Sequence, residues 1–170
     1  VLNWGLLSTA RINRALIPAL RLSRRSQLAG VASRELTHAQ TYAHDMRIPH
    51  AYGSYEAMLD DPGIDVIYNP LPNHLHAEWT IRAARAGKHV LCEKPIALTV
   101  DEVDAITAAA RENGVIVAEA FMYYHHPQTH TVMDLLARGE IGDVRLMSGE
   151  FSFLLQRPED IRLNPAYGGG

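Results

Sequence analysis

The stretch that decides the fold is IDVIYNPLPNHLHAEWTIRAARAGKHVLC, residues 64–92. Its apolar run at Ile64–Tyr68 predicts a buried strand, and a loop with two prolines follows. The segment His76–Ala86 predicts a helix, which ends at a glycine, the residue favoured just after a helix C-terminus. A second apolar run at Lys88–Cys92 predicts another strand. A strand, a helix and a strand in this order predict two parallel strands joined by a helical crossover.

The same alternation extends to both sides of this unit. Further short apolar segments predict strands at Val1–Leu7, Gln27–Ala32, Ala51–Tyr52 and Val115–Ala120. The segments between them predict helices at Arg11–Leu22, Glu35–Asp45, Ser54–Leu59 and Thr99–Glu112. Six strands alternating with helices predict an α/β fold, a doubly wound parallel sheet of the Rossmann type with helices on both faces.

The pattern changes after about residue 121. The segment His126–Arg138 predicts a helix, and Val144–Leu155 alternates apolar with polar residues. Such alternation is typical of an antiparallel sheet with one exposed face. We therefore predict one domain over residues 1–121. Over 122–170 we predict the beginning of a second, truncated α+β domain with a mostly antiparallel sheet.

Composition excludes several classes of protein. The 170 residues are 47% hydrophobic and 21% charged, with a net charge of −3, so we expect no nucleic-acid or anionic-membrane partner. No apolar run approaches the roughly 20 residues that span a bilayer, and the first residues lack the features of a signal peptide. The single cysteine, Cys92, excludes an internal disulfide and predicts a buried, inert thiol in a reducing compartment. We expect a cytoplasmic protein.

The turn after the first strand occupies the place of a nucleotide-binding loop. Doubly wound folds carry G-x-G-x-x-G there, but the three glycine positions are Ser8, Ala10 and Asn13 in this chain. Backbone N–H groups and the helix dipole bind phosphate without glycine, and the hydroxyls of Ser8 and Thr9 add donors. From these residues alone, a phosphate site and an ordinary strand–helix connection are equally good interpretations.

The second predicted strand is followed by Ser33 and Arg34. NAD-binding sheets place an acid near this position for the ribose 2′-hydroxyl, whereas NADP-binding sheets place an arginine for the 2′-phosphate. A hydroxyl beside a guanidinium favours phosphate, so the pair predicts NADP. A solvated surface arginine is the alternative, and the neighbouring Glu35 favours it slightly.

Three histidines near the predicted domain boundary, His125, His126 and His130, raise the question of a metal. No acid or cysteine is placed to complete a ligand set with them. We predict no metal site.

Three segments identify a family. Residues 67–76 read IYNPLPNHLH, residues 86–95 read AGKHVLCEKP and residues 119–128 read EAFMYYHHPQ. With Ser8-Thr9-Ala10, they resemble the glucose-fructose oxidoreductase, inositol dehydrogenase and rhizopine-catabolism (Gfo/Idh/MocA) family. Within it, the chain is most similar to the branch of dimeric dihydrodiol dehydrogenase and NADP-dependent D-xylose 1-dehydrogenase. The resemblance covers essentially the whole chain.

The resemblance implies a role for each matching residue. NADP would be the cofactor, with NAD as the alternative. Thr9, Ala10, Arg11 and Ile12 would face the pyrophosphate, and Ser33 and Arg34 would hold the 2′-phosphate. The ribose and nicotinamide would lie near Leu71, Asn73, His76 and Glu93. From the residues alone, His76 is either such a contact or a helix-entry residue. Lys94 would stand at the reacting carbon. In the family its peptide bond to Pro95 is typically cis, and cis bonds are essentially confined to proline. The full set of implied cofactor-binding residues is Ser8, Thr9, Ala10, Arg11, Ile12, Ser33, Arg34, Leu71, Asn73, His76, Glu93 and Lys94.

The implied activity is hydride transfer between the nicotinamide and a hydroxyl carbon of a sugar, polyol or dihydrodiol, with Lys94 handling the proton. Oxidation of the hydroxyl and reduction of the ketone are both compatible with these residues. The resemblance also implies a homo-oligomer, a dimer or tetramer, and a second proton-handling residue after residue 170. A non-catalytic, redox-sensing module is the alternative function, but a sensor needs no lysine at position 94.

Overall fold

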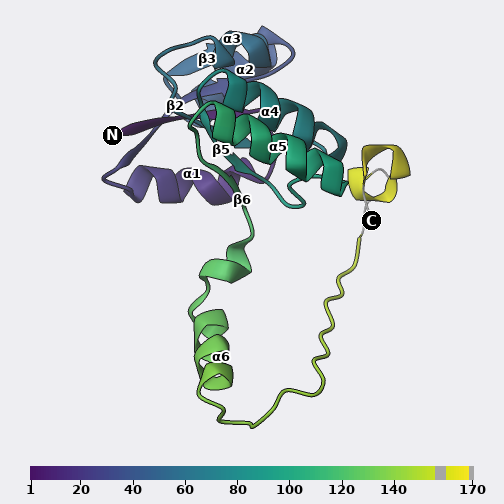
Figure 1. Ribbon diagram of the computed structural model, residues 1–170. Helices are drawn as coiled ribbons and strands as arrows, with labels where there is room; N and C mark the ends of the chain where they lie inside the picture. Colours follow the sequence, from purple (N-terminus) through teal and green to yellow (C-terminus); the bar gives the residue numbers. More distant parts are fainter. Residues whose placement is uncertain (156–159, 169–170) are drawn as a thin grey trace.

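Six parallel strands form one sheet in the computed structural model, which describes residues 1–155 and 160–168 (Figure 1). The strands are β1 (Leu2–Leu7), β2 (Ser26–Ala32), β3 (His50–Tyr52), β4 (Val66–Asn69), β5 (His89–Cys92) and β6 (Val117–Glu119). Their order across the sheet is β3-β2-β1-β4-β5-β6, which is the order of a Rossmann sheet. The predicted fold is confirmed. Each strand lies within three residues of its predicted bounds.

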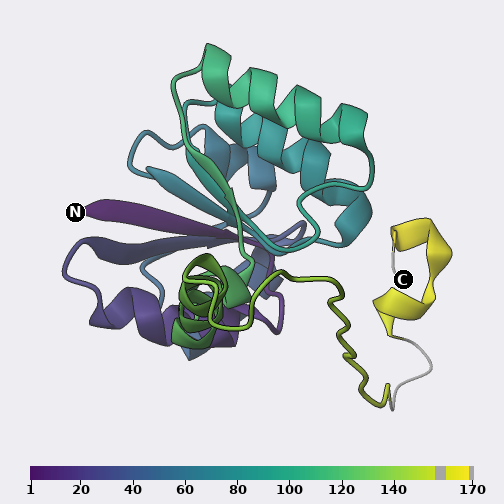
Figure 2. The ribbon, with the colours of Figure 1, turned by 60° about the horizontal axis from the view of Figure 1, so that its bottom comes forward.

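Helices cover both faces of this sheet, as Figure 2 shows. They are α1 (Asn13–Leu22), α2 (Leu36–Asp45), α3 (Tyr55–Leu59), α4 (His76–Arg85) and α5 (Val100–Glu112). Side chains of α1 and α2 pack on one face, and those of α3 and α4 pack on the other, where α5 lies along α4. The five helices predicted between the strands are therefore confirmed.

Neighbouring residues of one strand serve opposite cores. Leu6 and Leu7 are both fully buried, but Leu6 packs with α1 residues such as Ile17, whereas Leu7 packs with Met58 of α3. Successive side chains of a strand point to opposite faces, so a strand covered on both sides needs an unbroken apolar run. This is why β1 and β4 show no polar alternation.

After β6 the chain runs away from the sheet through helix α6 (Pro127–Ala137), and its last described turns come back beside the sheet domain (Figure 1). This part of the chain also contains the short 3₁₀ helix η2 (Met122–His125) and two 3₁₀ turns, η3 (Ile161–Leu163) and η4 (Pro165–Tyr167). Helix α6 matches the helix predicted over His126–Arg138. None of the helices in the described ranges is long and apolar enough to cross a membrane.

The strand predicted at Val144–Leu155 is wrong. In the structure this segment is irregular, and within the described ranges it makes no backbone hydrogen bond to any other segment. A strand exists only through hydrogen bonds to a neighbouring strand, and none lies beside it (Figure 1). The two predicted domains, 1–121 and 122–170, stay a prediction, and residues 156–159 and 169–170 of the second lie outside the described residues.

Candidate functional site

The turn between β1 and α1 has the shape that the glycine motif normally gives. Ser8 has a φ of +84°, a left-handed backbone that costs a residue with a Cβ about 1 to 2 kcal/mol and that explains why glycine is usual there. Asn13 takes the third glycine position, is fully buried, and donates from Nδ2 to the Ser8 carbonyl oxygen at 2.9 Å. This bond holds the turn closed where the motif would rely on close packing of a glycine.

Four consecutive backbone N–H groups at this turn have no partner in the described part of the chain; they belong to Thr9, Ala10, Arg11 and Ile12. The first helical bond from this region starts only at Asn13 N, which donates to Ala10 O at 3.1 Å. Free N–H groups and the positive end of the helix dipole together attract an anion. The turn therefore offers four free N–H donors to an anion, and the diphosphate contact that the resemblance implies stays a prediction.

The end of β2 presents Ser33 and Arg34. The Ser33 N–H donates to the Tyr52 carbonyl oxygen at 3.0 Å, which fixes the backbone just after β2 to the end of β3. The Arg34 side chain is exposed and forms no hydrogen bond or ion pair with any described residue. The neighbouring Glu35 lies 3.7 Å from Nε2 of His38. Arg34 thus follows β2, which pairs with β1, and its guanidinium is unpaired among the described residues. Its contact with the 2′-phosphate stays a prediction.

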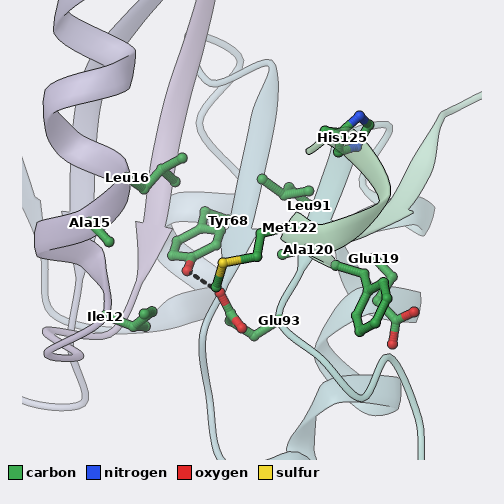
Figure 3. Close-up of a pocket in the computed structure, with 11 residues that line it drawn as sticks. Ile12, Ala15, Leu16, Tyr68, Leu91, Glu93, Glu119, Ala120, Met122 and His125 are labelled. Carbon is green, nitrogen blue, oxygen red and sulfur yellow. Dashed lines mark hydrogen bonds between the residues drawn. The ribbon is translucent and has the colours of Figure 1, made fainter. Parts of the chain in front are cut away.

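A cavity of about 380 Å³ opens where α1 faces the ends of β4, β5 and β6 (Figure 3). Most of its wall is apolar, and Glu93 and Glu119 supply carboxylates. The residues that line it are Ile12, Ala15, Leu16, Tyr68, Leu91, Glu93, Glu119, Ala120, Phe121, Met122 and His125. The cavity begins at the turn between β1 and α1, because Ile12 belongs to both. Open parallel sheets bind ligands at this place, outside the carboxyl ends of strands where the strand order reverses.

Glu93 is held in the cavity wall by two hydrogen bonds. Its Oε1 accepts from the Tyr68 hydroxyl at 2.7 Å (Figure 3), and its Oε2 accepts from the Lys94 N–H at 3.3 Å. Burial and the bond to Glu93 hold the pKa of the Tyr68 phenol well above its ordinary value. Tyr68 therefore remains a hydrogen-bond donor at neutral pH and fixes the Glu93 carboxylate.

Lys94 follows Glu93 at the carboxyl end of β5, and its peptide bond to Pro95 is cis. Its side chain is exposed, and its ammonium has no partner among the described residues. The next turn is fixed from the neighbouring strand, because Glu119 Oε1 accepts from the Ile96 N–H at 2.9 Å. Lys94 thus stands with an unpartnered side chain, among the described residues, on a loop that Glu119 holds in place, and its proton-handling role stays a prediction.

Three other predicted cofactor contacts lie differently. Leu71 is 5% exposed and belongs to the core of the α3–α4 face. Asn73 donates from Nδ2 to the Gly168 carbonyl oxygen at 2.8 Å. His76 is 1% exposed, with both ring nitrogens at backbone carbonyl oxygens. The structure favours the helix-entry role for His76, and cofactor contact by these three stays a prediction.

The sequence alone does not predict the polar residues that hold the site in place. Tyr68 is part of an apolar run in the sequence, and Asn13 stands where the nucleotide loop usually has its third glycine. Asn69 is fully buried and binds the loop after β4. The available signal was a polar side chain at the end of an apolar run, where buried polar groups need partners.

The described residues contain no group of three His, Cys, Asp or Glu side chains that could hold a metal ion. His126 instead begins α6, where its Nδ1 accepts from the Gln128 N–H at 3.1 Å. Cys92 is fully buried and unpaired. Burial, above all, raises the pKa of its thiol to about 12, so it is the inert thiol predicted.

Known proteins that are similar to this chain include sugar and diol oxidoreductases. It is 44% identical over 169 residues to D-xylose 1-dehydrogenase (NADP(+)) 2 of Haloferax volcanii, covering 98% of this chain and 51% of that protein. It is 37% identical over 156 residues to trans-1,2-dihydrobenzene-1,2-diol dehydrogenase of Danio rerio, covering 91% and 47%. The chain thus spans about half the length of the curated relatives it matches.

Solved structures agree. An aldose-aldose oxidoreductase from Caulobacter crescentus, complexed with glycerol, has a TM-score of 0.88 and 33% identity, over 98% of this chain and 51% of that one. A 3-ketoreductase from Actinomadura kijaniata, in complex with NADP, has a TM-score of 0.77 and 38% identity, over 85% and 46%. Residues 2–121 match the family model described as "Oxidoreductase family, NAD-binding Rossmann fold". The chain therefore belongs to this Gfo/Idh/MocA oxidoreductase family.

Proposed function

We propose that this chain carries the cofactor-binding part of an NADP-dependent oxidoreductase acting on a hydroxyl or keto carbon of a sugar, polyol or dihydrodiol. The observation that carries the proposal is the run of four free N–H groups, Thr9 to Ile12, which leads directly into the cavity at Glu93. The names of the relatives support it, since they include an NADP-dependent xylose dehydrogenase and diol dehydrogenases.

The residues fit NADP from one end to the other. The free N–H groups at Thr9–Ile12 would hold the diphosphate, and the unpaired guanidinium of Arg34 would hold the 2′-phosphate. The apolar wall formed by Leu16, Leu91 and Met122 would cover the ring end of the cofactor and exclude water. When bound, the nicotinamide accepts or donates the hydride.

Lys94 would handle the hydroxyl proton. It directly follows Glu93, which lines the cavity. Its ammonium is unpaired within the described ranges, and Glu119 accepts a hydrogen bond from Ile96 in the turn that follows. A positioned group of this kind contributes a factor of about 10² to 10⁴ to a reaction rate. Replacing Lys94 with Ala should therefore lower turnover by that factor while NADP affinity is largely kept.

Titration calorimetry with NADP and NAD tests the cofactor assignment. We expect NADP to bind more tightly than NAD, and Arg34→Ala to weaken NADP binding by about tenfold to hundredfold, because hydrogen bonds to charged groups are worth about 1.5 to 3 kcal/mol. NAD binding should not change. Arg111→Ala, which removes an exposed arginine on α5, is the matched control.

Each other outcome is informative. Equal affinities for NADP and NAD would remove the 2′-phosphate role of Arg34 and keep the dinucleotide site. Binding of neither, by a chain that melts cooperatively, would overturn the proposal. A wild type without turnover, whose NADP binding does not change in Lys94→Ala, would favour the alternative, a redox-sensing module. A homo-oligomer and a cytoplasmic location both stay predictions.

A further inference from the structure

We propose that His76 is a positioning residue that ties together the two loops flanking the cofactor cavity, and so fixes Lys94. The proposal rests on the proposed function. It assigns His76 a role beneath the site, in place of the direct cofactor contact that the family resemblance implies.

The imidazole ring lies between the loop after β4 and the loop after β5. Its Nε2 is 2.6 Å from the Leu71 carbonyl oxygen, and its Nδ1 is 2.6 Å from the Pro95 carbonyl oxygen. A carbonyl oxygen accepts a hydrogen bond from a ring nitrogen that carries an N–H, and both carbonyl oxygens lie within hydrogen-bond distance of the ring. One buried ring therefore joins two loops that are 24 residues apart in sequence, as the numbers of Leu71 and Pro95 show.

Asn69 holds the backbone of His76 in place. It is fully buried at the end of β4, and its Nδ2 donates both to the His76 carbonyl oxygen and to Thr80 Oγ1, each at 3.1 Å. Its Oδ1 accepts from the Leu71 N–H at 3.3 Å. The start of α4, the Leu71 loop and the ring thus form one buried polar network. Such networks are rigid when every member is satisfied.

The consequence for the site follows from the neighbour of Pro95. Lys94 directly precedes Pro95, so a ring bound to the Pro95 carbonyl oxygen holds the Pro95–Ile96 peptide unit, which is next to the lysine in the chain. The other nitrogen holds Leu71, on the loop before Asn73. The two nitrogens of His76 therefore address two different parts of the site. Their effects can be separated.

Two substitutions separate them. An asparagine side chain is short, so in His76→Asn the amide reaches the place of Nδ1, near Pro95, and not that of Nε2. A glutamine side chain is longer, so in His76→Gln the amide reaches the place of Nε2, near Leu71. Both amides supply N–H donors. Asparagine keeps the link to the Lys94 loop, and glutamine keeps the link to the Leu71 loop.

The chain contains two lysines, which makes the readout direct. Lys94 is exposed, whereas Lys88 is buried and donates from Nζ to the carbonyl oxygens of Asp61 and Ile64, both at 2.7 Å. The rate at which a soluble amine-acetylating reagent labels each lysine is measured by mass spectrometry, with and without NADP. Slow labelling of Lys88 reports that a variant is folded. NADP affinity is measured by calorimetry on the same samples.

In the wild type we expect NADP to slow the labelling of Lys94 severalfold. His76→Asn should keep this protection and bind NADP more weakly, and His76→Gln should lose the protection and bind NADP with nearly wild-type affinity. If both variants behave alike while Lys88 stays protected, the inference is wrong. A wild type that does not bind NADP would overturn the proposed function instead.

Discussion

Residues 1–121 and residues 122–168 differ in what they do with their apolar side chains. Both regions are rich in them, but every buried apolar residue of the described chain lies between Leu6 and Ala109. In the second region Phe151 and Leu154 are more than three-quarters exposed. The hydrophobic effect stabilises only surface that is removed from water, so an apolar sequence without a partner element gains nothing. The first region provides its own partners through crossover helices.

The residues of the candidate site are divided unequally between the same two regions. The free N–H groups, Arg34, Glu93 and Lys94 all belong to the first region and stand on strand ends that two cores hold in place. The second region contributes Met122 and His125 to the cavity rim and Gly168 as an acceptor for Asn73. We infer that the site is built by the sheet and only bordered by the rest.

The largest expected effect tests the contrast in burial. Leu7→Ala in β1 should lower the free energy of unfolding by about 2 to 5 kcal/mol, because it leaves a cavity in a core. Leu154→Ala, the same change at an exposed position, should alter it by less than about 0.5 kcal/mol. Urea unfolding measures both. A comparable loss from Leu154→Ala would show that the second region is packed in solution.

A second test concerns the buried ammonium of Lys88. Lys88→Met removes the donor to the Asp61 and Ile64 carbonyl oxygens, and an unpaired buried polar group costs about 1 to 3 kcal/mol. Lys94→Met is the control, since Lys94 is exposed and its loss should leave the unfolding free energy within about 0.5 kcal/mol. Equal effects of the two changes would contradict the role given to Lys88.

A smaller effect is expected where the two regions meet. Gly168 has a φ of +68°, and a Cβ there would lie 2.6 Å from Leu98 Cδ1. Gly168→Ala should weaken the docking of η4 and speed amide hydrogen exchange over residues 161–168. Gly142→Ala carries the same backbone cost, with a φ of +69°, but meets no atom within 4 Å. Exchange over 161–168 should not change in that control. Unchanged exchange in both variants would show that this contact is not formed in solution.

The smallest expected effect is that the Cys92 thiol does not react in the folded protein. With a pKa raised to about 12 by burial, the Cys92 thiol should remain unmodified by a thiol reagent at pH 8 in the folded protein, since the thiolate is the reactive form. Labelling should follow unfolding and become faster in Leu7→Ala. Rapid modification of the native wild type would show that the sheet opens locally at β5.

The sequence predicts well what local pattern determines. Unbroken apolar runs with helices between them indicate all six strands, and the motif that contains Lys94 indicates the family. The strand predicted at Val144–Leu155 is wrong because alternation shows which face of a strand would be buried and not whether a partner strand exists. Roles such as those of Asn13, Asn69 and His76 depend on carbonyl oxygens that the fold brings within reach, so the sequence alone does not reveal them.

The central claim is that the sheet region supplies the phosphate contacts of the dinucleotide site, which the second region only borders. Hydrogen–deuterium exchange of the chain with and without NADP tests it most directly. We predict slower exchange at residues 9–13, 33–35, 71–76 and 93–96 when NADP is present, and no change over 127–155. Protection over 127–155 without protection at 9–13 would contradict the claim.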